Sequence, residues 1–242
     1  KPEYMELFAC IGSECEDTCC SSWRIDIDKN TYKKYQKIKE KEIREVADSH
    51  IKRNRTNPSE DKYAYIKLND HGFCPFLTEG KMCKLQLKYG EDYLSTVCLT
   101  YPRIINSVDR VLEVSATLSC PEAARIALNQ QNGIDFVMKE ELVEGRSLIS
   151  NRLNLDKSTP LLNYWWNLRA FSIEILQNRQ YSLSERLIFL GIFLKKVQDD
   201  LDTNGGADLA NLMEKYKNML NTGLAKELIG QIPSTLSIQL QL

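Results

Sequence analysis

The sequence predicts a mainly α, α+β protein: an irregular Cys-rich, metal-binding lobe with a small β-hairpin, followed by a helical lobe. Three observations predict this class. All eight cysteines lie within the first 120 residues, residues 103–117 alternate like a hairpin, and apolar residues recur at helical spacing after residue 158. We expect a boundary near the stretch "NQQNG", between a lobe at 1–132 and a lobe at 133–242, which could also form one continuous unit.

The first lobe is expected to combine short elements around its cysteines. Asp28 is a candidate N-cap for a helix that extends to about residue 48, and residues 50–61 are expected to form a polar loop. The stretch "YAYIKL" at 63–68 alternates like a short strand. A hairpin that turns near Asp109 follows, and Pro121 occupies the first position of the next helix.

The second lobe is expected to be helical. Apolar residues are one helical turn apart in the stretch 159–179. Ser182 and Glu185 form a capping box that begins the next helix. The stretch "NGG" at 204–206 predicts a turn before a third helix. The last residues, 232–242, alternate between polar and apolar, and we assign no element to them.

Composition and charge exclude several classes of protein. The chain of 242 residues is 27% charged and 43% hydrophobic, which is typical of soluble globular proteins. A net charge of -1 gives no field that would attract nucleic acid or an anionic membrane. The longest apolar run, 187–194, is too short to span a bilayer, and no secretory signal opens the chain. We therefore expect no nucleic-acid partner and no membrane partner.

The cysteines form the pattern that indicates chemistry. They occur as C-x4-C-x3-C-C near the start and as C-x8-C-x14-C-x21-C after a gap of fifty-three residues. Soft thiolates suit zinc, copper(I) or an iron–sulfur cluster, and metal binding can hold segments that lack a regular pattern. The candidate ligands are Cys10, Cys15, Cys19, Cys20, Cys74, Cys83, Cys98 and Cys120.

Disulfides and buried free thiols are the two alternatives to a metal site. A bridge between the adjacent Cys19 and Cys20 needs a strained ring, and two bridges from neighbouring residues are crowded. Buried thiols account for one or two cysteines, such as Cys120, but poorly for eight. The cysteine spacing alone does not determine which metal is bound, because no C-x2-C pair and no ferredoxin spacing occurs. His71 lies three residues before Cys74 and is either a ligand or a turn residue.

Four motifs, in order along the chain, resemble one family. These motifs are "FACIGSECEDTCCSSWRIDIDKNTYKKY", "CPFLTEGKMCKLQ", "VCLTYPRIIN" and "LSCPEAARIAL". They resemble the flagellin lysine N-methylase family, which shares its cysteine arrangement with a YkgJ-like group of Cys-rich domains described as zinc- or iron-chelating. The resemblance covers about residues 4–130 and continues weakly through "SLSERLIFLGIFL".

The resemblance implies a cytoplasmic bacterial enzyme that methylates lysine ε-amino groups of flagellin with S-adenosylmethionine. It also implies a [4Fe-4S] cluster, with zinc as the alternative, in place of the usual methyltransferase fold. The lack of a G-x-G-x-x-G turn after an apolar strand agrees with this expectation. Family members are commonly longer than 242 residues, so a C-terminal part could lie beyond this sequence.

Carboxylates between the cysteines are candidate bases for this chemistry. A lysine must lose its proton before it attacks a methyl group, which requires a base or a dry environment. Glu16, Asp17, Asp26 and Asp28 are the candidates. A solvated carboxylate, or a helix cap in the case of Asp28, is the alternative for each of them.

Tyr101 and Arg103, close to Cys98 in the sequence, are candidate catalytic residues. Arg103 is also a candidate cofactor-binding residue, because a guanidinium can hold the carboxylate of the methyl donor with two hydrogen bonds. A packed tyrosine and a surface arginine are the alternative for this pair. The alternative function for the whole chain is a non-catalytic zinc- or iron-binding module whose helical lobe binds a partner.

Overall fold

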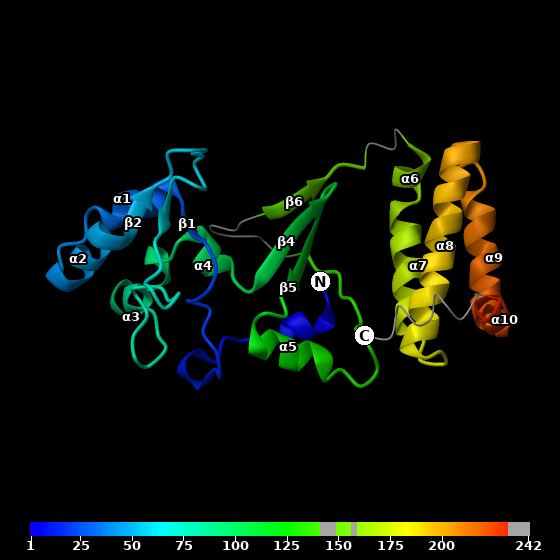
Figure 1. The fold of residues 1–242 in the computed structure, drawn as a ribbon, viewed down its shortest axis with the longest axis horizontal. Coiled ribbons are helices and arrows are strands. Elements are labelled where there is room, and N and C mark those ends of the chain that lie inside the picture. The colour runs from blue at the N-terminus through cyan, green and yellow to red at the C-terminus, as the bar shows by residue number, and fades with distance from the viewer. Residues whose placement is uncertain (141–148, 156–158, 232–242) are drawn as a thin grey trace. The chain divides into compact units, whose positions relative to one another are not determined.

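The computed structural model describes residues 1–140, 149–155 and 159–231. Its contacts divide the chain into two compact units, Lys1–Leu153 and Asn154–Leu242. The first unit holds two small sheets and short helices, and the second is built from helices (Figure 1). The mainly helical α+β class is therefore confirmed. The predicted domain boundary near residue 132 stays a prediction.

A three-stranded antiparallel sheet lies in the first core of unit 1. Ile66 in the middle strand is opposite both Ile25 and Ile51, and all three side chains are buried. The strand predicted within 63–68 is confirmed. The polar loop predicted at 50–61 begins later in the chain than expected, because Ile51 belongs to a strand of the sheet. The strands, in spatial order, are β1 (Ile25–Ile27), β3 (Ala64–Ile66) and β2 (Ile51–Arg53).

Two helices replace the single helix expected between residues 29 and 48. α1 (Lys29–Tyr35) ends in a tight turn, and α2 (Lys41–His50) begins after Glu40. Ile38 lies in the segment between the two helices. Its side chain is only 6% exposed and packs in the same core as the sheet. Burial of this side chain explains why the helix stops here although the sequence permits it to continue.

The side chain of Asp28 joins two helices. Its Oδ1 accepts from the Thr31 backbone N–H at 2.9 Å, which caps α1 as predicted. Its Oδ2 accepts from the Thr31 hydroxyl at 2.7 Å and from the Thr96 hydroxyl at 3.1 Å. Thr96 begins α4 (Thr96–Thr100), and Asp28 is only 6% exposed. One buried carboxylate therefore fixes the start of α4 against the start of α1.

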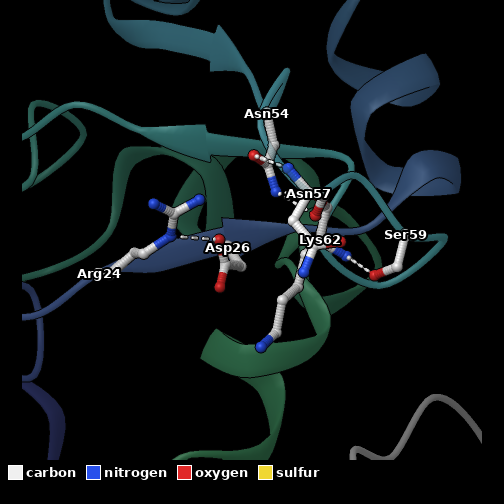
Figure 2. A network of polar contacts seen from close by, with 6 residues as sticks. All are labelled: Arg24, Asp26, Asn54, Asn57, Ser59 and Lys62. Atoms are coloured by element: carbon white, nitrogen blue, oxygen red, sulfur yellow. Dashed lines mark hydrogen bonds and ion pairs between the residues drawn. The ribbon is translucent and has the colours of Figure 1, made fainter.

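The loop between β2 and β3 is closed by its own polar side chains (Figure 2). The Asn54 amide donates to the carbonyl of Asn57 at 2.8 Å and to that of Lys62 at 2.9 Å. The Lys62 backbone N–H donates to the Ser59 hydroxyl at 3.0 Å. Figure 2 also shows the ion pair between Arg24, the residue before β1, and Asp26 in β1. The Arg24 Nε and Asp26 Oδ1 atoms are 2.7 Å apart.

The predicted hairpin forms a second sheet. β4 (Arg103–Val108) and β5 (Val111–Ala116) are antiparallel and turn at Asp109, whose φ is 51°. β6 (Ile149–Leu153) adds to β4 as a parallel strand that the sequence did not predict. α5 (Pro121–Leu128) follows β5, with Pro121 at its start as expected.

Short helices complete unit 1. α3 (Lys84–Tyr89) follows the cysteine-containing loop, and the 3-10 helix Glu91–Tyr93 connects it to α4. Near the N-terminus lie two further 3-10 turns, Glu3–Glu6 and Gly12–Glu14. The opening cysteine segment is therefore irregular, and packing against neighbouring elements must hold it in place.

Unit 2 consists of helices around an aromatic core. Phe193 packs edge-to-face against Phe171, with ring centroids 5.0 Å apart, and lies 5.4 Å from the Tyr216 ring. The predicted capping box of Ser182 and Glu185 is confirmed. The predicted segment 159–179 forms two helices. The helices are α6 (Pro160–Asn163), α7 (Trp165–Gln177), α8 (Leu183–Asn204), α9 (Leu209–Thr222) and α10 (Leu224–Gly230).

Two expectations from the sequence concern the C-terminal residues and membrane-spanning helices. Residues 232–242, to which we assigned no element, lie outside the described residues. Among the residues that are described, no helix is both long enough and apolar enough to cross a membrane.

We expect Phe193→Ala to destabilise unit 2 by about 3–5 kcal/mol, because it leaves a cavity among packed aromatic rings. Phe193 is 0% exposed, whereas its neighbour Leu194 is 46% exposed. The matched control Leu194→Ala should therefore cost less than about 1 kcal/mol. Urea unfolding followed by circular dichroism measures both, and equal losses would contradict this packing.

We expect Asp28→Asn to lower the free energy of unfolding by about 1–3 kcal/mol at pH 7, because an amide nitrogen cannot accept from Thr31 and Thr96. Burial alone would raise the pKa of Asp28, but the hydrogen bonds from these threonines hold this pKa below its usual value. The carboxylate therefore stabilises the fold above about pH 4, and this contribution is lost as pH falls through the lowered pKa.

Urea unfolding of wild type and Asp28→Asn at pH 7 and near pH 3 measures this linkage. The difference between the two proteins should shrink at the lower pH. The control Asp26→Asn removes a partly buried carboxylate whose single described ion pair is with the exposed Arg24, and it should cost less than about 1 kcal/mol. If Asp28→Asn lowers the free energy of unfolding by the same amount at both pH values, the stability does not depend on ionisation of Asp28.

Candidate functional site

Five cysteines from separate parts of unit 1 line one pocket. Its volume is about 70 Å³, and its wall combines thiols with aromatic and aliphatic side chains. The five cysteines are Cys19, Cys20, Cys74, Cys83 and Cys98, and the aromatic residues are Trp23, Tyr35, Phe76 and Tyr101. The structure therefore brings together thiols that are up to 79 positions apart in the sequence (98 − 19).

Backbone contacts determine where these thiols lie. The Cys74 N–H donates to the Cys20 carbonyl at 2.7 Å, which aligns the loop after β3 with the opening cysteine segment. Cys83 is the residue before α3 and Cys98 lies within α4, whose N-cap is Ser95. The short helices α3 and α4 therefore present thiols to a common pocket.

Burial and mutual repulsion keep most of the pocket thiols protonated. Burial raises the pKa of Cys98 to about 12; the Ser95 hydroxyl opposes this rise, and the Cys83 and Cys19 thiols add to it. A hydrogen bond from Cys19 lowers the pKa of Cys20, but contact with Cys74 and burial raise it to about 12. Burial also raises the pKa of Cys83. Several thiolates in this pocket would therefore need a cation to balance their charge.

The donor set suits a soft metal ion or an iron–sulfur cluster. Among residues 1–140, 149–155 and 159–231, however, no three His, Cys, Asp or Glu side chains are already arranged as ligands of one metal ion. His71 lies in the turn before Cys74, where its backbone N–H donates to the Asn69 side chain at 3.0 Å. All eight cysteines are free thiols.

A second group of thiols lies at the start of α5. Burial raises the pKa of Cys120; the N–H groups of Ala123 and Glu122 oppose this rise, and the nearby Cys15 and Cys10 thiols add to it. An ion pair of 2.6 Å between Glu16 and Arg125 holds the segment beside Cys15 on α5. Cys10 is exposed to solvent.

Trp23 is a site residue that the sequence analysis missed. Its ring stacks on Tyr101 with centroids 5.8 Å apart and an interplanar angle of 28°. Its indole N–H donates to the Cys19 carbonyl at 2.7 Å, and both rings line the pocket. The signal that could have identified Trp23 is its position three residues after Cys20, within the motif "CCSSW".

Tyr101 lies at the pocket, whereas Arg103 does not line it. Burial raises the pKa of Tyr101; the Ser119 hydroxyl, 3.3 Å from its own, opposes this rise, and charges on Cys120, Cys19 and Asp17 add to it. Arg103 instead lies over the Phe8 ring, 5.4 Å from its centroid. The roles assigned to Tyr101 and Arg103 stay predictions.

The candidate bases have different surroundings. Asp17 accepts from the Thr18 N–H at 2.7 Å and lies close enough to the pocket for its charge to act on Tyr101. Glu16 and Asp26 are in ion pairs, with Arg125 and Arg24 respectively. Asp28 is the helix cap described above. Of these four carboxylates, Asp17 has no arginine or lysine ion pair described, and its role as a base stays a prediction.

Comparison with known proteins assigns the chain to a family. Residues 169–242 match the FliB lysine N-methylase C-terminal domain. Proteins named lysine-N-methylase from Salmonella typhimurium and Salmonella choleraesuis are 29% identical to the chain over 239 residues. The flagellar biosynthetic protein FliU of Salmonella muenchen is 35% identical over 135 residues, which are 55% of this chain and 79% of FliU. The chain belongs to the FliB lysine N-methylase family.

The match to the FliB-family relatives covers both units. It includes 97% of this chain, but the chain spans only 57% of the length of each of the two lysine-N-methylases. No solved structure is significantly similar to it. The family resemblance identified from the cysteine motifs is thus confirmed.

We expect Cys10 to react with iodoacetamide at least about a hundredfold faster than Cys98 in the reduced, metal-free protein. With a pKa of about 12, only about one Cys98 in ten thousand is ionised at pH 8, and the thiolate is the nucleophile. Mass spectrometry of timed samples measures both rates. In urea the two rates should converge; a fast Cys98 in the folded protein would show that the pocket is open.

Proposed function

We propose that this protein is a lysine N-methyltransferase that acts on flagellin in the bacterial cytoplasm, with S-adenosylmethionine as methyl donor. The observation that carries the proposal is the pocket lined by thiols and aromatic rings in a chain of the FliB lysine N-methylase family. The names of the relatives, a lysine-N-methylase and a flagellar biosynthetic protein, support the reaction and the flagellar substrate.

We propose that the cysteines hold a [4Fe-4S] cluster. Thiolates are the ligands of such clusters, and eight free thiols are available within unit 1. When bound, a cluster with three protein ligands supplies a Lewis-acidic iron with one position open to a small polar ligand. The residues that would hold it come from the eight cysteines of the two groups described above.

Aromatic side chains at the pocket can receive a cation. The faces of tryptophan and tyrosine attract a lysine ammonium or a sulfonium group. Trp23 and Tyr101 both line the pocket, and the raised pKa of Tyr101 keeps its hydroxyl protonated at neutral pH. Tyr101 therefore acts as a hydrogen-bond donor in this proposal and not as the base.

Asp17 is the base in this proposal. It takes a proton from the lysine ammonium, after which the amine nitrogen forms a bond to the methyl carbon. The bond between that carbon and the donor sulfur breaks, so the sulfonium becomes a neutral thioether. The charge of Asp17 acts on both Cys19 and Tyr101, which is the observation that favours it over the other carboxylates.

A non-catalytic metal-binding module is the second candidate function. The observation that favours it is the burial of thiols in a hydrophobic core, because closed thiolate sites commonly have a structural role. A methylation assay distinguishes the two functions. Full-length protein, isolated without oxygen, is incubated with flagellin and S-adenosylmethionine, and flagellin lysines are then examined by mass spectrometry.

We expect methylated lysines with the wild-type protein and a loss of about 10²–10⁴-fold in rate with Asp17→Asn, since the variant lacks the proton acceptor. The control Asp70→Asn changes an exposed acid in the turn before Cys74 and should keep the wild-type rate. No methylation by the wild-type protein would favour the metal-binding module. Equal rates in the two variants would exclude Asp17 as the base.

A further inference from the structure

One surface of unit 1 carries arginine and lysine side chains around two tyrosine rings. Tyr63 and Tyr65 are two residues apart in an extended segment, so their side chains lie on the same side of the first sheet. The buried Ala64 and Ile66 lie on the opposite side. We call the outer side the cationic face and define it by Arg24, Lys29, Lys52, Arg53, Tyr63 and Tyr65.

The tyrosine rings of the cationic face hold its two arginines in place. The Arg53 guanidinium lies 3.5 Å from the centroid of the Tyr63 ring and donates to the Tyr63 hydroxyl at 2.7 Å. The Arg24 guanidinium lies 4.6 Å from the centroid of the Tyr65 ring. A stacked guanidinium has lost part of its freedom before any ligand arrives, so less ordering entropy opposes the binding of a carboxylate.

The cations of this face keep hydrogen-bond donors for a ligand. Arg53 uses two of its five N–H groups, toward the carbonyl and the hydroxyl of Tyr63. Arg24 donates through Nε to Asp26, and Figure 2 shows its two terminal nitrogens turned away from that carboxylate. Lys52 is exposed opposite Tyr65, and no carboxylate partner of it occurs in the part of the chain that the structure describes.

Positive charge is in excess along the chain around the cationic face. Residues 29–55 contain ten Lys or Arg and four Asp or Glu. All four acids are in ion pairs, two of them with Lys84 and Lys88 outside this segment. Three of the ten cations have a carboxylate partner among the described residues, which leaves seven without one. The net charge of -1 for the whole chain therefore conceals a local positive surface.

The cationic face suits an acidic polypeptide better than a nucleic acid. Bases bind to proteins by stacking on open aromatic rings, but Arg53 and Arg24 each cover one face of a tyrosine ring. The carboxylates of Asp26 and Glu60 pair with cations of the face, and they would repel a continuous phosphate backbone. The separate carboxylates of a polypeptide can each reach one guanidinium group and form two hydrogen bonds with it.

A ligand on the cationic face leaves the thiol-lined pocket open. None of the six residues that define the face belongs to the pocket wall. Ile25 and Ile66 line the pocket from the buried side of the sheet, whereas the face occupies the outer side. A polypeptide can therefore bind to the face while the pocket stays available for a reacting side chain.

We propose that the cationic face is a docking surface for an acidic segment of a partner protein. Carboxylates of this segment bind Arg24, Lys52 and Arg53. The partner is the protein whose lysine is methylated; this assignment rests on the proposed function, whereas the docking surface itself does not. Contacts remote from the reacting atoms contribute to substrate affinity and leave the chemical step unchanged.

Binding of an oligoglutamate peptide to the full-length protein tests the surface without an enzymatic step. We expect Lys52→Gln combined with Arg53→Gln to weaken binding about tenfold or more, because charge-assisted hydrogen bonds are lost. The matched control, Lys215→Gln combined with Lys226→Gln, removes the same charge from exposed positions on α9 and α10. It should change binding less than about twofold. Fluorescence anisotropy of the labelled peptide measures all three proteins.

Three results of the binding experiment would overturn the proposal. The first is a wild-type protein that does not bind oligoglutamate. The second is equal weakening by the two double variants, because binding would then follow net charge alone. The third is a wild-type protein that binds a single-stranded DNA oligonucleotide more tightly than oligoglutamate, with the DNA affinity reduced in the Lys52→Gln, Arg53→Gln variant. That result would make the face a nucleic-acid surface.

Acetylation of lysines in the wild-type protein keeps the test valid if the double variant at the face fails to fold. Lys52 and Lys215 are both exposed, so the reagent reaches both of them in the free protein. Saturating oligoglutamate should slow the acetylation of Lys52 and leave that of Lys215 unchanged, as measured by mass spectrometry of timed samples. Equal protection of the two lysines would contradict a docking surface at the face.

Steady-state methylation of flagellin tests whether the docked partner is the substrate. We expect the Lys52→Gln, Arg53→Gln variant to raise KM for flagellin about tenfold with kcat unchanged, and the control variant to keep both values. A lower kcat with unchanged KM would contradict the docking role. If the wild type methylates no flagellin, the proposed function fails, and oligoglutamate binding still decides whether the surface exists.

Discussion

The buried carboxylate of Asp28 is the contact on which the thiol-lined pocket depends. It accepts hydrogen bonds from the first turns of both α1 and α4, and α4 carries Cys98. α4 has only five residues, too few to be stable as an isolated helix. Its position therefore comes from this carboxylate, from Ser95 as its N-cap and from the core beneath it.

Burial of the pocket thiols favours their neutral form. The surrounding core raises their pKa values and favours neutral SH groups, whereas a bound cation favours thiolates. Cys74 lies in the hydrophobic core, and Cys20, Cys83 and Cys98 pack against it as small hydrophobic residues. The pocket is therefore rich in cysteine although, among the described residues, no three His, Cys, Asp or Glu side chains are grouped to hold one metal ion.

The two units contribute to the family relationship in different ways. The cysteine motifs that resemble the family lie in unit 1, whereas the match to the FliB C-terminal domain, residues 169–242, lies in unit 2. Unit 2 has an aromatic core of its own around Phe193, while the thiols and Tyr101 belong to unit 1. The cysteine motifs and the match to the C-terminal family domain therefore lie in separate units of the chain.

The sequence alone determined the features that depend on local order: the Asp28 cap, the Asp109 hairpin, Pro121 at a helix start, and the capping box of Ser182. These follow from neighbouring residues and fixed spacing. Only the tertiary structure decided the break at Ile38, the pairing of β6 with β4, the stacking of Trp23 on Tyr101 and the grouping of five thiols around one pocket. Each of these depends on contact with residues distant in the sequence, whose burial outweighs local preference.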